Sequence, residues 1–519
     1  MLGSVVAAPA ARDGMTALAG PPESVSRARR IAGPLLVGSA GFLVAVVGSW
    51  VPSIWYDEAA TVTSATRSWT ALGREVQSVD LVHATYYALM HCWFAIVGYS
   101  PLALRFPSAV AVGLTAALLV LLGRRLAGDR VGLLAGLFFV LLPRVTWMGA
   151  EGRSFALGAL LATAASVLLL IAIDRSGTNY RAWPWWVAYT AVSILGGSVF
   201  LYLVLVTASH GLTVLAVRRF RRGAVRPPLV SWAVAATITV AALVPLAVAS
   251  SRQSAQISWI QHISRHTIEE VLVTQFSYEN AGFAILLWVL IAAGIVGAVR
   301  LPRIRPVLAV GVPWMAVPTV GLIVASIITH PLYSPRYVAY AAPAAALLMA
   351  APFALVPNRW IRPMAIVAVL LACAMTAPTW VAQRTTAAKD DSAWNQVAAL
   401  VEQQRRTGPN RAQDVVLYGP VQRHPKATSR IIAETYPDAF TGLRDPLLVT
   451  AAGAGDGLWE TQRPLSDAGA VVGDASTIWL LTAVAPDERA AATGALRPEG
   501  FHITREWKIA RTWVVRYQR

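Results

Sequence analysis

Charged residues are scarce in this sequence: they make up 14% of its 519 residues, whereas hydrophobic residues make up 56%. Soluble globular domains usually carry about a quarter charged residues. A deficit of this size over so long a chain means apolar surface that water cannot cover, and a lipid bilayer is the solvent that suits it. The composition excludes an ordinary soluble protein and predicts a membrane protein.

Cysteine is almost absent, since only Cys92 and Cys373 occur and both lie within apolar segments. Two such residues exclude a disulfide framework and a cysteine metal cluster, and they predict inert packing. A concentrated basic surface is also absent. The net charge is +17, but the arginines form short runs between apolar stretches, which is typical of topology signals. We therefore do not expect nucleic-acid binding.

The N-terminus has no convincing cleavable signal. Residues 1–30 are rich in Ala, Pro and Ser and end in arginines directly before a long apolar run. This pattern predicts a disordered cytoplasmic tail followed by an uncleaved first span.

The apolar runs predict about eleven transmembrane helices, since a bilayer core needs roughly 20 apolar residues per helix. The predicted spans are 31–51, 105–123, 131–146, 155–173, 185–197, 200–217, 229–250, 282–299, 306–328, 338–356 and 362–380. The range 185–217 is either one long helix or two short helices with a turn at Gly196-Gly197-Ser198.

The arginines set the predicted orientation. With the N-terminus inside, the cytoplasmic segments hold nearly twice as many arginines as the external ones, as the positive-inside rule requires. Eleven spans then place the C-terminus outside a multi-pass plasma-membrane protein. The apolar run 84–97 is too short to cross, so we expect an interfacial helix in a first external loop of residues 52–104.

Residues 381–519 differ in composition from the apolar part of the chain before them. Their pattern predicts an extracytoplasmic α/β domain, beside a membrane domain of residues 31–380. A helical pattern at 392–402 is followed by a strand at 414–418. Further strands are expected at 477–482 and 512–517, with a helix starting near 486.

An acidic pair, Asp57 and Glu58, follows the first span and directly succeeds Trp55 and Tyr56. A carboxylate at the membrane surface can act as a general base on an acceptor hydroxyl. The alternative is a solvated helix cap, because acidic residues favour a first helical turn, and the spacing favours neither interpretation.

Asp80 and His83 form a second candidate pair in the same loop. They could line a sugar site or, with Asp57, hold a divalent cation. A lone Asp/His pair is a weak metal signal, so a divalent cation stays an open alternative at these residues, and helix capping by Asp80 is the commoner interpretation.

Three external arginines, Arg105, Arg153 and Arg336, adjoin apolar helix ends. Their guanidinium groups would suit a lipid-linked phosphate at that depth. The alternative is snorkelling to lipid headgroups. Glu151 is an alternative structural partner for Arg153.

The external loop 251–281 contains two histidines and two glutamates but no His-Glu-x-x-His pattern, so a metalloprotease is excluded. His266 and Glu270 are better explained by a polar loop helix, and His210 by packing within a span.

Five short motifs together resemble the GT-C superfamily of membrane glycosyltransferases. The nearest branch is the family-39-like one, which includes protein O-mannosyltransferases, aminoarabinose transferases and actinobacterial mannosyltransferases. The motifs are Tyr56-Asp-Glu-Ala-Ala-Thr, Asp80-Leu-Val-His-Ala-Thr-Tyr-Tyr-Ala-Leu-Met-His, Leu104-Arg-Phe-Pro-Ser-Ala, Glu151-Gly-Arg-Ser-Phe-Ala-Leu and Ser334-Pro-Arg-Tyr. They occur in order over about 300 residues. Many relatives have His-Pro-Pro where this chain has His83-Ala-Thr, and the C-terminal domain has no counterpart in the resemblance.

The resemblance implies transfer of a sugar from a polyprenyl-phosphate donor outside the cytoplasm. It implies Asp57 as the base, with Glu58 in a supporting role, and the 84–97 run as the second juxtamembrane helix. The implied substrate-binding residues are Asp80, His83, Tyr86, Arg105, Arg153, Tyr333, Arg336 and Tyr337. Arg153 and Arg336 would hold the carrier phosphate.

Direct displacement by one base would invert the anomeric centre. Mannose is the favoured sugar, and the acceptor is a cell-envelope glycan, a lipoglycan or a protein. High Ala, Arg and Trp content fits a high-GC actinobacterium and hence a role in its envelope. The rival functions are a polyprenyl-linked glycan polymerase or ligase, a lipid or sugar transporter, and a structural assembly protein.

Overall fold

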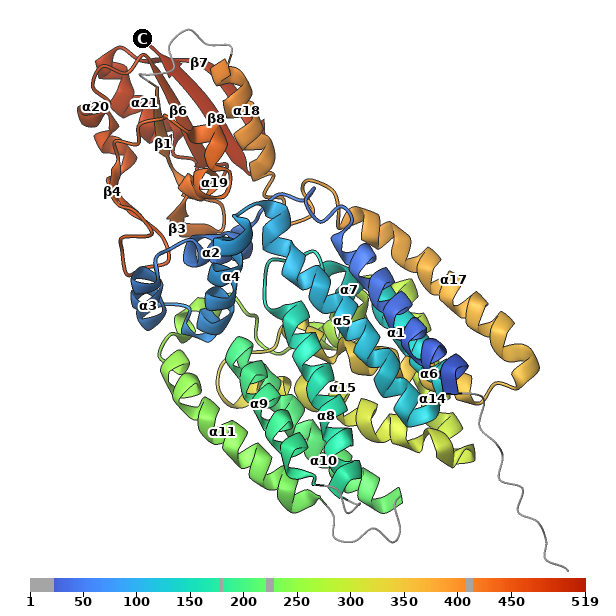
Figure 1. Cartoon of the computed structure of the whole chain (residues 1–519). Helices are drawn as coiled ribbons and strands as arrows, with labels where there is room; N and C mark the ends of the chain where they lie inside the picture. Colours follow the sequence, from blue (N-terminus) through green and yellow to red (C-terminus); the bar gives the residue numbers. More distant parts are fainter. Residues whose placement is uncertain (1–22, 177–180, 221–227, 407–413) are drawn as a thin grey trace, which may run out of the picture.

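The structure is a computed structural model that describes residues 23–176, 181–220, 228–406 and 414–519. Figure 1 shows a large helical bundle with a smaller, sheet-containing domain at one end. A helix covers each predicted span at least in part. These helices are α1 (Glu23–Val46), α5 (Pro101–Ala127), α6 (Asp129–Leu141), α8 (Phe155–Ser176), α9 (Trp183–Val199), α10 (Val204–Phe220), α11 (Leu229–Ser251), α14 (Ala281–Arg300), α15 (Arg305–Ile328), α16 (Ala342–Ala350) and α17 (Asn358–Ala382).

Seven helical segments of the described chain are long and apolar enough to cross a membrane. Two of them are composite: the 3-10 turn η5 (Pro302–Ile304) precedes α15, and the 3-10 turns η6 (Pro335–Ala341) and η7 (Ala351–Ala354) extend α16. The outer surface of the bundle is apolar: Leu36, Val299 and Ile328 are each more than 70% exposed. Side chains of this kind require lipid around them, so the chain is a polytopic membrane protein.

Several predicted boundaries differ from the structure, and two of the differences change an interpretation. Helix α1 begins at Glu23, inside the predicted tail, and residues 1–22 of that tail lie outside the described residues. The 185–217 range forms two helices, but α9 continues through Gly196 and Gly197 and ends at Val199. A Cβ on Gly197 would lie 2.2 Å from Leu243, so this glycine permits close helix packing, and the predicted turn there is wrong.

The loop of residues 52–104, predicted to be external, is itself helical. It consists of α2 (Tyr56–Ala65), α3 (Trp69–Ser78), the 3-10 turn η1 (Leu81–His83) and α4 (Ala84–Val97). The predicted helix at 84–97 is therefore present. Its residues Tyr87, Met90 and Phe94 are buried, while Leu89 and Ile96 are exposed. This distribution gives α4 one face toward the protein and one apolar face outward, as an interfacial helix requires.

The short helices α7 (Pro143–Met148), α12 (Arg265–Glu269) and α13 (Gln275–Ser277) lie between spans, with a π-helical turn η4 (Glu270–Thr274) before α13.

The C-terminal domain contains a four-stranded sheet in the order β1-β6-β8-β7. The strands are β1 (Val415–Tyr418), β6 (Thr477–Ala483), β7 (His502–Ile509) and β8 (Thr512–Gln518). Strands β1 and β6 are parallel and the other pairs antiparallel. Two small ladders pair β2 (Pro420–Val421) with β3 (His424–Thr428) and β4 (Leu448–Thr450) with β5 (Thr461–Gln462). The helices are α18 (Trp394–Arg406), α19 (Arg430–Thr435), α20 (Ala468–Val471) and α21 (Arg489–Leu496). An α/β domain was predicted and is confirmed.

One hydrophobic core joins the 52–104 loop to the C-terminal domain. It includes Val62 and Tyr87 from the loop and Trp394, Ile431 and Trp479 from the domain. The two segments far apart in sequence therefore pack as one unit over the end of the bundle (Figure 1). This unit positions α2, which carries the acidic pair.

Candidate active site

The acidic pair divides into two environments at the start of α2. Consecutive helical residues point about 100° apart, so Asp57 and Glu58 cannot face the same side. The Asp57 side chain is 23% exposed, whereas the Glu58 side chain is fully buried. Only Asp57 is accessible to a substrate.

Glu58 forms a buried ion pair with Arg105. The Arg105 guanidinium donates to Glu58 at 2.8 and 2.5 Å and to the carbonyls of Ser49, Pro52 and Ser53. Burial alone would raise the pKa of Glu58, but Arg105 and Lys389 outweigh it and hold that pKa below its ordinary value. Every N–H of Arg105 faces a partner of this kind, so we assign it a structural role instead of the predicted substrate contact.

Asp57 forms an ion pair with Arg336, with Oδ2 and Nη1 2.9 Å apart. The Arg336 guanidinium also lies over the rings of Trp259 at 4.4 Å and Trp55 at 5.6 Å. Its Nε is buried and has no hydrogen-bond partner among the described residues. An unpaired buried donor beside a partly exposed carboxylate is a ready contact for an anionic ligand.

Arg153 connects the predicted residues of the first loop. It donates to the Asp57 carbonyl at 3.0 Å, to the Tyr87 hydroxyl at 3.3 Å and to His83 Nε2 at 2.9 Å. Since arginine can only donate, His83 Nε2 is an acceptor and its ring is neutral. Burial lowers the pKa of His83 well below its ordinary value, and Arg153 and Arg336 lower it further, which agrees with a neutral ring.

Asp80 accepts a hydrogen bond from Tyr87 at 2.7 Å. Burial raises the pKa of Asp80, although Arg153 and this hydrogen bond oppose the rise. Its backbone is left-handed, with φ of 57°, and its side chain does not cap the following helix. The interpretation of Asp80 as a cap is therefore wrong, and the structure joins Asp80, His83, Arg153 and Asp57 in one network.

The three tyrosines that were predicted to bind substrate have different surroundings in the structure. Tyr86 is buried among the core residues of α4, so we assign its ring to packing, and its hydroxyl has no hydrogen-bond partner among the described residues. Tyr333 donates to Gln275 at 3.1 Å, away from Asp57. Tyr337 lies nearer, with its ring 6.2 Å from Trp259 and 5.7 Å from the Arg336 guanidinium.

The sequence interpretation missed Tyr87, Trp259 and Lys389 as members of the site. Tyr87 follows His83 by four residues, so helical spacing could have found it. Trp259 and Lys389 come from distant segments and carry no local signal. Glu151 pairs with Lys389 and not with Arg153, which corrects the suggested Glu151–Arg153 partnership.

Two other histidines that the sequence analysis considered, His266 and His210, have local structural explanations. His266 contacts Glu269 at 3.2 Å on an exposed helix, as expected of a polar loop. His210 is buried between Ser166 and Tyr189, both at 3.0 Å. Among the described residues, no three His, Cys, Asp or Glu side chains group as metal ligands do. Asp57, Asp80 and His83 each contact another protein group instead.

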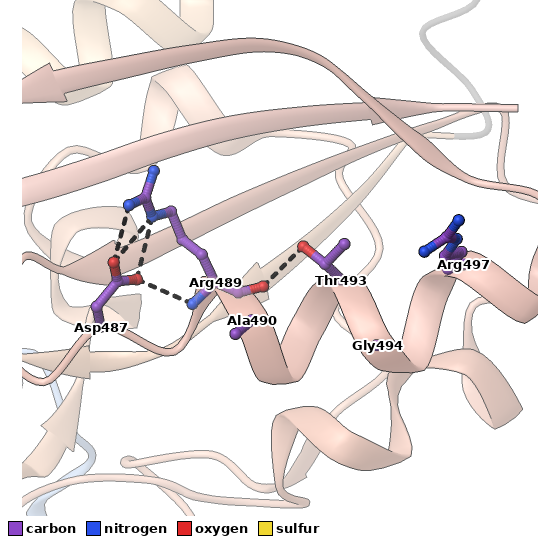
Figure 2. Close-up of a pocket in the computed structure, with 6 residues that line it drawn as sticks. All are labelled: Asp487, Arg489, Ala490, Thr493, Gly494 and Arg497. Carbon is purple, nitrogen blue, oxygen red and sulfur yellow. Dashed lines mark hydrogen bonds and ion pairs between the residues drawn. The ribbon is translucent and has the colours of Figure 1, made fainter.

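The C-terminal domain reaches the acidic pair through Tyr56. His424 stacks on the Tyr56 ring at 3.5 Å, and Trp459 donates to the Tyr56 hydroxyl at 2.9 Å. A separate open pocket of about 480 Å³ lies on α21, where Arg489 pairs with Asp487 (Figure 2). None of its lining residues belongs to the network around Asp57.

Comparison with solved structures gives matches over nearly the whole chain. ArnT from Cupriavidus metallidurans in the apo state has a TM-score of 0.57 and 14% identity, covering 95% of this chain and 98% of that one. ArnT bound to undecaprenyl phosphate gives 0.56 and 13%, covering 93% and 97%. The archaeal oligosaccharyltransferase AglB from Archaeoglobus fulgidus, in complex with an inhibitory peptide and a dolichol-phosphate, gives 0.51 and 10%, covering 94% and 74%.

No protein-family model and no curated protein matches the sequence. Sequence identities this low establish the fold of the chain, but not its activity or its substrates. The chain is a polytopic helical membrane protein of the GT-C fold, with a C-terminal α/β domain.

Proposed function

We propose that this chain is a membrane glycosyltransferase that moves a sugar from a polyprenyl-phosphate donor to an acceptor hydroxyl. The observation that carries the proposal is the Asp57–Arg336 pair, in which a partly exposed carboxylate lies 2.9 Å from an arginine with an unpaired Nε. A solved structure with the same fold is bound to undecaprenyl phosphate and another to a dolichol-phosphate. These ligands support a polyprenyl-phosphate carrier here.

The proposed step needs one base and one anion site. Asp57 accepts the proton of the acceptor hydroxyl as its oxygen attacks the anomeric carbon. The bond between that carbon and the phosphate oxygen breaks, and its electron pair stays on the departing phosphate. Arg336 and Arg153 stabilise the charge that develops there. A single displacement inverts the anomeric configuration.

The proposed network also positions the reactants. Arg153 binds the Asp57 carbonyl, and so it fixes the first turn of α2 against His83 and Tyr87. Asp80 and His83 then face the sugar or the acceptor. Correct placement of two reactants is worth several kcal/mol of the barrier, about 7–11 in well-oriented cases.

Within this proposal, we favour mannose as the sugar and an envelope glycan, a lipoglycan or a protein as the acceptor. We also place the site on the extracytoplasmic face. The arginine distribution favours an orientation in which the 52–104 loop and the C-terminal domain lie on that side. A glycan polymerase or ligase would use the same carrier but a larger donor. A transporter would concentrate its charged residues near mid-membrane, whereas this network lies in the first loop and at helix ends.

The test is to incubate the purified full-length protein with a set of labelled polyprenyl-phosphate sugars and candidate acceptors. We expect one donor to be consumed, with inverted configuration in the product. Retained configuration would contradict the single displacement. Transport of the intact donor without cleavage would contradict the enzymatic function.

A further inference from the structure

Lys389 lies in the short segment between α17 and α18, outside the membrane domain predicted from the sequence. Its ammonium group is buried and donates to the Ala150 carbonyl at 2.8 Å. It forms an ion pair with Glu151 and lies 3.9 Å from Glu58. The linker thus delivers a cation to the buried carboxylates beside the site.

The cluster around Lys389 is balanced in charge. Two carboxylates, Glu58 and Glu151, face two cations, Arg105 and Lys389, and all four side chains are buried. Removing one partner of such a cluster leaves a buried charge uncompensated, and the remaining groups must move or change protonation. The position of Glu151 therefore depends on Lys389.

Glu151 in turn holds Trp55. Its carboxylate accepts a hydrogen bond from Trp55 Nε1 at 2.7 Å. The Trp55 ring faces the Arg336 guanidinium at 5.6 Å, and Arg336 pairs with Asp57. A continuous series of contacts thus runs from Lys389 through Glu151 and Trp55 to Arg336.

We propose that Lys389 is a positioning residue for sugar transfer, which sets Trp55 and Arg336 through Glu151. The inference rests on the proposed function, and it means that the site is incomplete without residues beyond 380.

The backbone around Lys389 is held tightly enough for this role. Arg384 donates to the carbonyls of Val44 at 3.0 Å and Val47 at 3.2 Å, which fixes the end of α17 against α1. Asp390, Asp391 and Ala393 have φ values of 50°, 52° and 45°. Non-glycine residues rarely adopt this conformation unless the surrounding contacts impose it.

The experiment is a double-mutant cycle on the full-length protein, in which the second substitution restores the balance of charge. We expect Lys389→Met to lower kcat by about tenfold or more, with little change in KM for the acceptor, because a displaced Arg336 stabilises the departing phosphate poorly. Glu151→Gln should also lower kcat. The double variant Lys389→Met/Glu151→Gln restores neutrality and should recover most of the activity lost in Lys389→Met. Lys426→Met, at an exposed lysine of the C-terminal domain, is the matched control.

A wild-type kcat in Lys389→Met would overturn the inference, as would a double variant whose loss equals the product of the two single losses. If Lys389→Met does not fold, the comparison is between Glu151→Gln and the double variant. The double variant should then be the more active, and equal activity would overturn the inference.

A binding measurement separates this inference from the proposed function. Undecaprenyl phosphate should bind Lys389→Met about tenfold more weakly than the parent, with recovery in the double variant. Unchanged binding would overturn the role of Lys389 even if no sugar transfer is observed. Binding of undecaprenyl phosphate that depends on Lys389, with no sugar transfer by the parent from any donor, would instead overturn the proposed function alone.

Discussion

Asp57 and Arg336 form a 2.9 Å ion pair although Asp57 lies in the first turn of α2 and Arg336 lies in the first turn of the helical segment 335–354. In the proposed reaction a donor phosphate competes with Asp57 for Arg336. When the phosphate binds, the carboxylate is released from its cation and becomes available to the acceptor hydroxyl. Donor binding therefore precedes activation of the base.

Arg336→Lys should lose activity almost as fully as Arg336→Ala. A lysine keeps the charge but has neither the planar fork that matches phosphate oxygens nor the face that lies over Trp259 at 4.4 Å. We expect both variants to lower kcat by about 10²–10³-fold, the usual effect of removing one transition-state donor. Arg303→Lys, in the 3-10 turn η5 that precedes α15, is the control. Full activity in Arg336→Lys would show that charge alone suffices.

Tyr87→Phe should lower activity more than Tyr86→Phe. The Tyr87 hydroxyl joins Asp80 at 2.7 Å to Arg153 at 3.3 Å, whereas Tyr86 belongs to the buried core beside it. Loss of one such hydrogen bond from a neutral group to a charged one costs about 1.5–3 kcal/mol, or roughly tenfold to a hundredfold in rate if it is felt in the transition state. Equal effects of the two substitutions would contradict the network.

Glu58→Ala should damage folding more than catalysis. It leaves Arg105 buried without its carboxylate, which costs about 3–5 kcal/mol when one member of a buried pair is removed. The measurement is the thermal unfolding midpoint of the detergent-purified protein, compared with Asp57→Ala. We expect a large decrease for Glu58→Ala and a small one for Asp57→Ala, and the reverse order would contradict the division of roles.

The contact between the first loop and the C-terminal domain should weaken as pH rises toward neutrality. Glu434 accepts a hydrogen bond from Thr63 at 2.9 Å. Burial and neighbouring Glu460 raise the pKa of Glu434 from 4.5 to about 7. Between about pH 4.5 and pH 7, Glu434 therefore keeps its proton in the folded protein but has lost it in the unfolded chain. The stabilisation is complete below about pH 4.5 and is lost as pH rises through about 7.

The measurement is the unfolding midpoint between pH 5 and pH 8 in the parent and in Glu434→Gln. The amide still accepts from Thr63 but does not titrate, so the decrease with pH should be smaller in the variant. Glu499→Gln, at an exposed carboxylate, should leave the decrease unchanged. An identical decrease in all three proteins would contradict the assignment to Glu434.

Much of the fold follows from local sequence patterns. Apolar runs of sufficient length identify the helices, and the pattern in 84–97 identifies α4. Strand β7 was missed because it lies at the sheet edge, where His502, Arg505 and Lys508 interrupt its apolar pattern. Gly196 and Gly197 were misinterpreted because a glycine that permits helix packing and a glycine in a turn look alike in sequence.

The site was predictable only where its residues lie in motifs. Asp57, Asp80, His83, Arg153 and Arg336 all belong to the short motifs quoted from the sequence, and the structure brings them together. Arg105 has the same local signature, but its burial against Glu58 is a tertiary property. Lys389 could not be found from the sequence, because its role depends on how the linker folds back onto Glu151.

The most direct test of the account is sugar transfer by Asp57→Asn, measured with the donor that the wild-type protein consumes. Asparagine keeps the size of the side chain but cannot accept the hydroxyl proton, and a general base usually contributes about 10²–10⁴-fold. We predict a decrease in kcat of that size, with an unfolding midpoint close to that of the parent and normal activity in Asp129→Asn as a control. Transfer by Asp57→Asn at the wild-type rate would contradict the central claim.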